Sequence, residues 1–343
     1  MNNKLINKLA FLKHNRNLMH PDNREQMYWF FREQFRFGHR EVLLDYLSLN
    51  YSHLIEGFLQ HGVRPHAKVG TWPYQKLQKS FSTFYPSFVW SKHAELMARA
   101  NGHRHVKAIG APWLYALSNA GYFSDGKFKD PSAHERTRDL LIVPAHGSGH
   151  YFANSHYSNM VDKVRKQVGD VDASVLLYYT EFCDPNVRRE WSTKGFALEC
   201  SGFAWGAEHR TLWTYNGGRP NFLKNTLSVL LKHREVMCTS PTTLAIYSTS
   251  LGIPTSILID PEISLVMSVV NEGKGVERLR KYDSEISELS KNLLGEDFSK
   301  RDISESKVNF SLQYLGIESF QSQESLRSIL PLLSGLIPVP SQE

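Results

Sequence analysis

The clearest pattern in the sequence is an alternation of short apolar runs with amphipathic stretches between residues 139 and 260. Four apolar runs have the length of strands: 139–145, 173–181, 235–240 and 254–260. Three stretches with a helical spacing of apolar residues lie between them: 159–169, 221–234 and 242–252. Strands that alternate with helices are typical of βαβ units, in which helices cover both faces of a parallel sheet. The pattern therefore predicts an α/β lobe over residues 139–265.

The first 120 residues show a shorter and weaker form of this pattern. Residues 1–50 read mostly as helix, and we interpret the aromatic stripe at 27–37 as core. Apolar pieces and one helical stretch follow, at 51–65, 87–90, 91–102 and 106–112. The polar, turn-rich segment 121–138 is the best candidate for a linker. We expect an N-terminal lobe over 1–120, this linker, the lobe over 139–265 and a helical C-terminal extension over 266–343.

Composition and charge narrow the classes of function. The 343 residues are 41% hydrophobic, and 40 Lys and Arg are spread along the chain among 34 acids, for a net charge of +6. Nucleic-acid binding favours a concentrated basic stripe, so we predict no nucleic-acid partner. The positive excess fits a protein that meets anionic phosphates or an anionic membrane surface. A mildly basic soluble protein is an equally good interpretation.

Cysteine usage and hydropathy bear on location. Cys183, Cys200 and Cys238 form no CxxC pair, which favours a reducing compartment over a disulfide scaffold or a structural zinc site. The N-terminus lacks the apolar core of a signal peptide, and no window approaches the roughly 18 apolar residues that span a bilayer. We expect a cytoplasmic protein and leave open a peripheral contact with the inner face of the membrane.

A run of small hydroxyl residues follows the apolar run 235–240. Ser240, Thr242 and Thr243 flank Pro241 immediately before a predicted helix. Hydroxyls at this place cap a helix N-terminus. They also stand beside free backbone N–H groups at the positive end of the helix dipole, which together form a site for phosphate. The sequence leaves both interpretations open: helix caps alone, or a phosphate site.

A second loop, at 144–150, follows the first apolar run of the same lobe. It holds His146, Ser148 and His150 among glycines, which let a backbone approach a ligand closely. The histidines can donate hydrogen bonds to a phosphate or a sugar hydroxyl. Two histidines four residues apart also resemble a metal pair, but the glycines between them argue against one helical face. We predict no metal and no cofactor.

Three further positions are candidates for contacts with a ligand. Glu181 ends the run 173–181 and could contact a ribose or a sugar, although a solvated acid at a strand end is the plainer alternative. Tyr215 could stack on a base. His61, in the turn Gln60-His61-Gly62, could take a proton from a hydroxyl near neutral pH, since histidine titrates there. A surface histidine is the alternative.

These motifs resemble bacterial glycosyltransferases of the GT-B architecture, in the branch of polysaccharide, teichoic-acid and nonulosonate transferases. Four motifs within about residues 51–262 carry the resemblance: Gln60-His61-Gly62, Gly110-Ala111-Pro112, Pro144-Ala145-His146, and Thr242-Thr243 with Gly252-Ile253-Pro254. The resemblance implies two Rossmann-like α/β lobes, with a short acceptor-side lobe first and a nucleotide-sugar-binding lobe second. It also implies that His61 is the general base and that the paired hydroxyls hold the donor phosphate.

The implied activity is metal-independent transfer of a sugar from a nucleotide-activated donor to a surface polysaccharide or glycoconjugate, such as lipopolysaccharide or capsule. The acceptor partner would be a glycan or a lipid-linked glycan. The predicted catalytic residues are His61 and His146. The predicted donor contacts are Ser148, His150, Glu181, Tyr215, Ser240, Thr242 and Thr243.

The chain also departs from the family pattern. Threonines replace the usual serines, Pro241 precedes them, and the first lobe is short. The sequence lacks the Glu-x7-Glu pair that marks many UDP- or GDP-sugar enzymes, which favours a CMP- or CDP-activated donor and leaves UDP open. Two other functions remain. One is a nucleotide-sugar epimerase of the same fold, and the other is a non-catalytic partner that binds a glycan or nucleotide sugar in an assembly complex.

Overall fold

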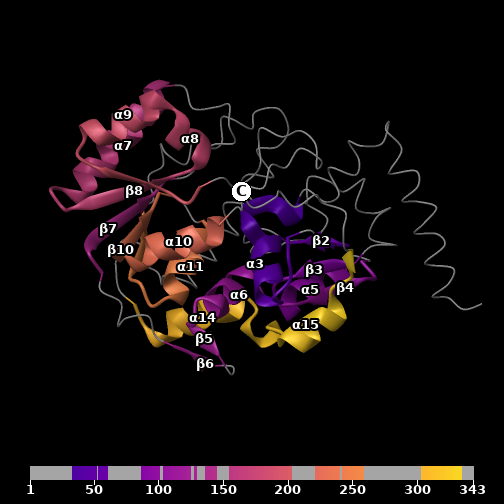
Figure 1. The fold of residues 1–343 in the computed structure, drawn as a ribbon. Coiled ribbons are helices and arrows are strands. Elements are labelled where there is room, and N and C mark those ends of the chain that lie inside the picture. Colours follow the sequence, from indigo (N-terminus) through magenta and orange to yellow (C-terminus); the bar gives the residue numbers. More distant parts are fainter. Residues whose placement is uncertain are drawn as a thin grey trace, which may run out of the picture.

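The structure is a computed structural model, and Figure 1 shows its fold. It describes residues 33–51, 53–60, 86–100, 103–124, 127–129, 136–144, 154–202, 221–239, 242–258 and 303–333. Within these residues, no helix combines the length and the apolarity that crossing a bilayer requires.

A five-stranded parallel sheet forms the larger lobe, in the order β11-β10-β7-β8-β9. Its strands are β7 (Arg138–Val143), β8 (Ala173–Leu177), β9 (Ala197–Cys200), β10 (His233–Cys238) and β11 (Thr255–Ile257). The helices between them are α7 (Asn154–Val168), α8 (Tyr179–Cys183), α9 (Pro185–Thr193), α10 (Phe222–Leu231) and α11 (Thr243–Ser250). The helix expected over 221–234 ends earlier, because His233 already pairs with Arg138 of β7.

The sheet is buried on both faces, as its continuous apolar strands predict. Along β7, Leu140 and Ile142 pack in one hydrophobic cluster, with residues of α7 and α9. Leu141 and Val143 point to the opposite face and join a second cluster, with residues of α10 and α11. The alternation follows from the two-residue repeat of a strand.

The smaller lobe contains a second parallel sheet, in the order β2-β3-β4. Its strands are β2 (Phe58–Leu59), β3 (Ser87–Val89) and β4 (Val106–Ala108). The helical elements of this lobe are η2 (Glu33–Gly38), α3 (His39–Tyr46), α5 (Lys92–Ala100) and α6 (Pro112–Asn119). The expected strand over 106–112 is shorter, because Pro112 occupies the first turn of α6, where a missing N–H is tolerated. The predicted linker 121–138 contains a hairpin, β5 (Phe123–Ser124) with β6 (Lys127–Phe128).

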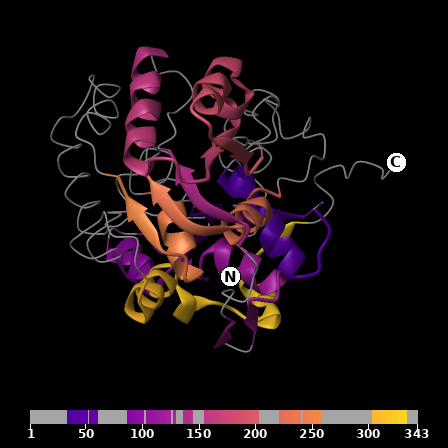
Figure 2. The same cartoon turned by 90° about the vertical axis from the view of Figure 1, so that its left-hand side faces the viewer.

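The C-terminal segment runs beneath both lobes in the two views of Figures 1 and 2. It comprises α14 (Glu305–Tyr314), η6 (Ile317–Ser319), α15 (Gln323–Ile329) and β12 (Leu332–Leu333). Helix α14 packs on α11 of the larger lobe, whereas β12 pairs antiparallel with β1 (Leu54–Ile55) of the smaller one. At the bend between them, a Cβ on Gly316 would lie 1.9 Å from the carbonyl oxygen of Trp90, and φ is +77°. Only glycine fits this approach.

Side-chain packing joins the two lobes where α6 meets α11. The rings of Trp113 and Tyr247 stack with centroids 4.2 Å apart, and Trp113 Nε1 donates to Ser250 Oγ at 3.0 Å. All three residues are buried and belong to, or lie against, one hydrophobic cluster with residues from both lobes. The predicted α/β class with parallel sheets is therefore confirmed, and the two sheets share a core.

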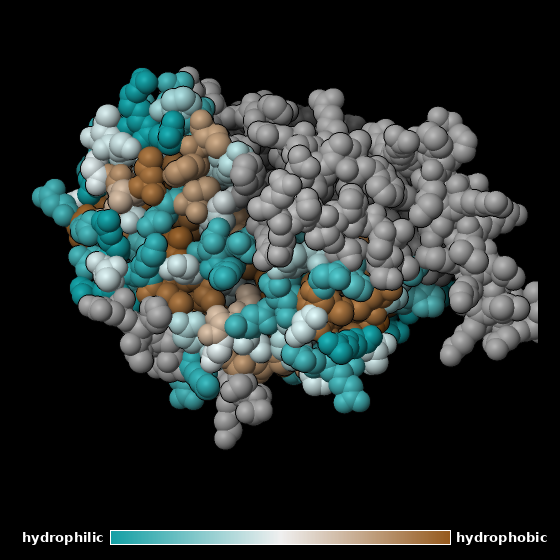
Figure 3. All heavy atoms as spheres, in the orientation of Figure 1, coloured by the Kyte–Doolittle hydropathy of each residue, from teal (hydrophilic) through white to brown (hydrophobic). Residues whose placement is uncertain are grey.

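Few large apolar side chains are exposed in the part of the chain that the structure describes. Among the described residues, Leu96 and Val171 are the large hydrophobic residues that are clearly exposed. Figure 3 shows one face, on which hydrophilic residues surround several apolar patches.

Candidate functional site

The order of strands in the larger sheet creates a place where loops diverge. In chain order β7 is first, and the chain builds β8 and β9 on one side of it before crossing over to β10 and β11 on the other. Counted from the edge at β9, the strands of the sheet come third, second, first, fourth and fifth in the chain, so the direction of the order reverses between β7 and β10. In open parallel sheets, ligands bind outside the carboxyl ends of the strands at such a switch point.

The loops predicted to bind a ligand leave from this point. Val143, the last residue of β7, is in register with Cys238, the last residue of β10. The N–H of Thr239 donates to the carbonyl of Val143 at 3.0 Å. The loop that begins at Pro144 and the loop that begins at Thr239 therefore start side by side.

Thr242 occupies the N-cap position of α11 but does not cap it with its side chain. Its backbone is extended, with φ −128° and ψ 164°, and its carbonyl accepts the N–H of Ala245 at 3.1 Å. Its hydroxyl lies 3.8 Å from Cys238 Sγ, at hydrogen-bonding distance for sulfur. By contrast, the N-cap serines of α14 and α15, Ser304 and Ser322, accept N–H bonds from the first turn. Capping alone therefore does not explain Thr242, and this interpretation of the hydroxyl run was wrong for that residue.

Cys238 supports the loop and is not a nucleophile. It is fully buried at the end of β10. Burial raises the pKa of its thiol to about 12, while the hydrogen bond from Thr242 opposes the shift. A neutral thiol is unreactive at physiological pH, and the contact of its sulfur with the Thr242 hydroxyl is structural.

Glu181 differs from both alternatives that the sequence offered. Strand β8 ends at Leu177, so Glu181 lies in α8 and not at a strand end. The side chain is buried, at 8% exposure, and Oε2 accepts the N–H of Tyr178 at 3.2 Å. It is thus not a solvated acid, and a contact with a ligand stays a prediction.

Most other predicted site residues lie outside the described residues: His61, His146, Ser148, His150, Tyr215 and Ser240. Their roles stay predictions. The structure does place Gln60, which precedes His61 at the carboxyl end of β2. Trp90 donates to it twice, from its N–H to Gln60 Oε1 and from Nε1 to the Gln60 carbonyl, both at 3.0 Å. The chain is therefore held firmly where His61 begins.

Sequence reasoning missed a group of buried polar side chains where η2 meets α3. Its members are Gln34, His39, Arg40 and Glu41, each exposed by 5% or less. Gln34 exchanges two hydrogen bonds with the backbone of Ile55, at 3.1 and 2.9 Å. No local pattern signals this group, because adjacent polar residues such as those at 39–41 normally point to solvent.

This group lies where the two lobes meet. The ring of Phe37, just before α3, packs edge-on against Phe222 at the start of α10, with centroids 5.1 Å apart. Element η2 packs against both β2 and α10, and Figure 1 shows α3 beside α10. Within the described residues, no group of three or more His, Cys, Asp or Glu side chains could hold a metal ion.

Comparisons with known proteins give little beyond this geometry. No protein-family model matches the sequence, and no curated protein matches it either. Among solved structures, the chain is similar to MnaA of S. aureus with UDP, at 14% identity over 71% of the chain, with a TM-score of 0.36. It is also similar to UDP-GlcNAc 2-epimerase from Neisseria meningitidis bound to UDP-GlcNAc, at 13% identity over 74% of the chain, with a TM-score of 0.35.

The chain spans 64% and 67% of the lengths of these two proteins. Similarity this low leaves the function to be argued from the residues of this chain.

Proposed function

We propose that the protein binds a nucleotide-activated sugar at the switch point between β7 and β10 and transfers the sugar to a glycan acceptor. The observation that carries the proposal is the strand order, which starts the loops after Val143 and Cys238 side by side. One loop is rich in glycine and histidine, and the other in hydroxyls before a helix. That combination suits a phosphate group.

Helix α11 supplies the electrostatic argument. The first N–H groups of a helix have no partner within it, and they stand at the positive end of its dipole. The Thr242 side chain does not cap these groups. In our proposal Thr242, Thr243 and Ser240 hold the donor phosphate together with His146, Ser148 and His150. Stabilising the leaving phosphate is the main catalytic task, because preorganised donors act where charge develops.

The remaining roles follow the proposed geometry. His61 is the general base that takes the proton from the acceptor hydroxyl, and Tyr215 and Glu181 contact the base or the sugar. The donor is a CMP-, CDP- or UDP-activated sugar. The acceptor is a glycan or lipid-linked glycan of a surface polysaccharide.

Binding of CMP, CDP, UDP and their sugars, measured by calorimetry, tests the proposal. Replacing Thr242 and Thr243 by alanine should weaken nucleotide binding about tenfold or more, as loss of at least one hydrogen bond to a charged group does. The unfolding free energy should change little, because the Thr242 side chain makes no cap bond and the sulfur of Cys238 is a weak acceptor for its hydroxyl.

Ser322→Ala is the matched control. Its side chain accepts the N–H of Ser325 at 3.2 Å. Removing it should destabilise the protein by about 1 kcal/mol and leave nucleotide affinity unchanged. Equal nucleotide affinity in the double threonine variant and the wild type would reduce the threonines to structural residues.

One observation favours a second candidate, a nucleotide-sugar epimerase. Such an enzyme needs acidic residues beside the sugar. Glu181 is one buried acid, and Glu41, where the lobes meet, is a second. Incubating a nucleotide sugar without acceptor separates the two. An epimerase converts the sugar and keeps the nucleotide attached, whereas a transferase leaves it unchanged.

A further inference from the structure

The Glu41 carboxylate is paired through one of its two oxygens. Arg40 approaches Oε1 with two nitrogens, Nε at 3.0 Å and Nη2 at 2.7 Å. The other oxygen, Oε2, is fully buried and accepts no hydrogen bond from any described residue. The residue as a whole is 5% exposed. A buried carboxylate oxygen without a donor is costly and rare in proteins.

The surroundings explain why this oxygen matters. Arg40 is 1% exposed, and its Nη1 also faces the carbonyl of His53 at 3.4 Å, so the guanidinium is fixed in place. The carboxylate is thereby oriented with Oε1 occupied and with Oε2 buried and lacking a donor among the described residues. Burial raises the pKa of Glu41, although Arg40 opposes the shift. A group so placed can accept a hydrogen bond as a carboxylate or donate one as an acid.

The backbone before α3 is unusual at the same place. Phe37 has φ +56° and Gly38 has φ +68°, so two successive residues adopt the left-handed conformation. For phenylalanine this costs about 1–3 kcal/mol, which the surroundings must offset. The turn brings the ring of Phe37 against Phe222 of the other lobe. Both rings are only partly buried, so the contact between the lobes reaches the surface beside the turn.

We propose that Glu41, oriented by Arg40, is a ligand-contacting residue whose Oε2 exchanges a hydrogen bond with a hydroxyl of the sugar in the bound nucleotide sugar. The inference rests on the proposed function, because it requires the nucleotide to sit on the larger lobe with its sugar directed toward the smaller one. It assigns sugar recognition to α3 and nucleotide recognition to α11.

The test compares affinities for a nucleotide and its sugar conjugate. UDP with UDP-GlcNAc, and CMP with CMP-sialic acid, serve as probes in calorimetry on the full chain. Glu41→Gln keeps the shape and the contact of Oε1 with Arg40. It should weaken binding of the conjugate about tenfold or more and leave the bare nucleotide unchanged.

Glu95→Gln is the matched control, since Glu95 is a second buried acid on a described helix of this lobe. Both of its oxygens already have partners within the lobe. This variant should be less stable but should keep the wild-type ratio of the two affinities.

A double variant keeps the test valid if Glu41→Gln leaves Arg40 unpaired and the protein unfolds. Arg40→Met with Glu41→Leu removes both members of the buried pair, which is often neutral for stability. It should fold and show the same selective loss of conjugate affinity. A folded variant with the wild-type ratio overturns the assignment of Glu41 alone. A wild-type protein that binds neither nucleotides nor conjugates overturns the proposed function, and this inference with it.

Discussion

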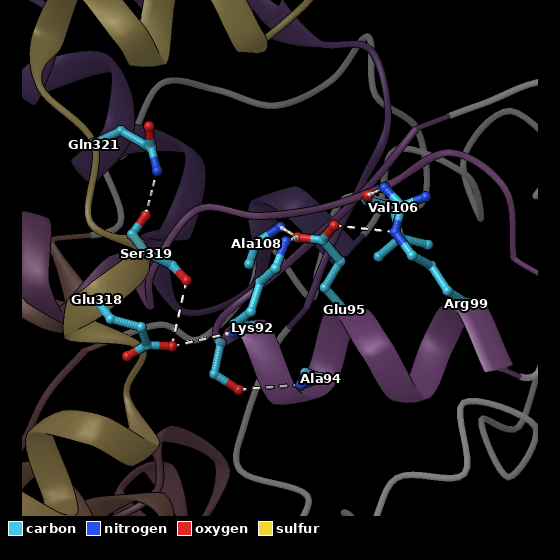
Figure 4. Close-up of polar contacts among 10 residues, drawn as sticks. Lys92, Ala94, Glu95, Arg99, Val106, Ala108, Glu318, Ser319 and Gln321 are labelled. Atoms are coloured by element: carbon cyan, nitrogen blue, oxygen red, sulfur yellow. Dashed lines mark hydrogen bonds and ion pairs between the residues drawn. The ribbon is translucent and has the colours of Figure 1, made fainter.

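Among the described residues of the smaller lobe, two buried glutamates lie on helices, and they are held in opposite ways. Glu95 of α5 is saturated: Oε1 accepts Arg99 Nε and Oε2 accepts the N–H of Ala108, both at 3.0 Å, and Lys92 Nζ lies 3.1 Å from Oε2 (Figure 4). Glu41 of α3 has Arg40 on one oxygen and no hydrogen bond from a described residue on the other. The two side chains are nearly equally buried, at 4% and 5% exposure.

The difference teaches that equal surface exposure does not fix the state of a buried acid, because its depth below the surface and its partners both set its pKa. Burial by itself raises the pKa of Glu95, but hydrogen bonds from Ala108, Lys92 and Arg99 hold it below its ordinary value. Burial also raises the pKa of Glu41, and there Arg40 does not offset it. Glu95 is therefore a structural anion. By accepting the N–H of Ala108 it also covers part of the unpaired edge of β4, and a charged side chain at such an edge disfavours pairing with another chain. Glu41 retains the capacity for a further contact.

The largest effect should come from removing the saturated acid. Glu95→Ala deletes a charged hydrogen bond to the buried N–H of Ala108, which is worth about 1.5–3 kcal/mol. The ion pairs with Lys92 and Arg99 add little, because both cations are about half exposed. We expect a loss of about 2–3 kcal/mol in urea denaturation.

The pH dependence of that loss sharpens the comparison. The folded-state pKa of Glu95 is lowered, so its contribution is present above pH 4.5 and is lost as the pH falls through the folded value. The gap between wild type and variant should therefore narrow in acid. A gap that stays constant from pH 7 to pH 3 would contradict the role of the ionised carboxylate.

The sequence predicted four of the five strands of the larger lobe, because they are buried and read as continuous apolar runs. It did not predict the edge strand β9, which is only half-buried. In the smaller lobe it predicted β3, α5 and β4, but not how the chain pairs at a distance. The strand β1 is two residues long, and its partner β12 lies nearly the whole chain away, with Leu54 opposite Leu333. No local pattern encodes a pairing of that kind. The helices of the C-terminal extension were predicted, but not its return to the first lobe.

In the candidate site, too, features with a local sequence signal were predicted and features that depend on tertiary packing were not. The loop at Thr242 was predictable, because a strand followed directly by hydroxyls and a helix is a local signal. The orientation of its hydroxyl toward Cys238 was not, since it depends on where β10 ends. Glu41 was missed for a physical reason: adjacent charged residues on a helix normally point to solvent, and tertiary packing alone buries Arg40 and Glu41 together.

A smaller effect should follow from loosening the start of α5, on which Glu95 is carried. Glu318 of the C-terminal segment accepts the N–H of Lys92 at 3.1 Å, and Ser91 Oγ accepts that of Ala94 at 3.2 Å (Figure 4). Glu318 is exposed. An anion at a helix N-terminus contributes about 0.3–1 kcal/mol, and salt screens it. Glu318→Ala should therefore lower stability by about 0.5 kcal/mol in low salt and by less in 0.5 M NaCl, whereas Ser91→Ala should show no salt dependence.

The smallest effect concerns a third acid of this lobe, Glu56. It tests whether burial that no partner offsets raises the pKa of a carboxyl group, as argued for Glu41. Its N–H donates to the carbonyl of Pro331 at 2.8 Å, where β1 meets β12, and burial raises the pKa of its side chain to about 7. Because the folded-state value lies above the ordinary 4.5, its contribution is present below pH 4.5 and is lost as the pH rises through about 7. The side chain is only partly buried, so solvent screening should keep the change under about 0.5 kcal/mol. Glu56→Gln should melt with the wild type at pH 4.5 and above it at pH 8, by thermal denaturation in matched buffers. Melting temperatures that differ by the same amount at both pH values would show that the carboxyl does not titrate with folding.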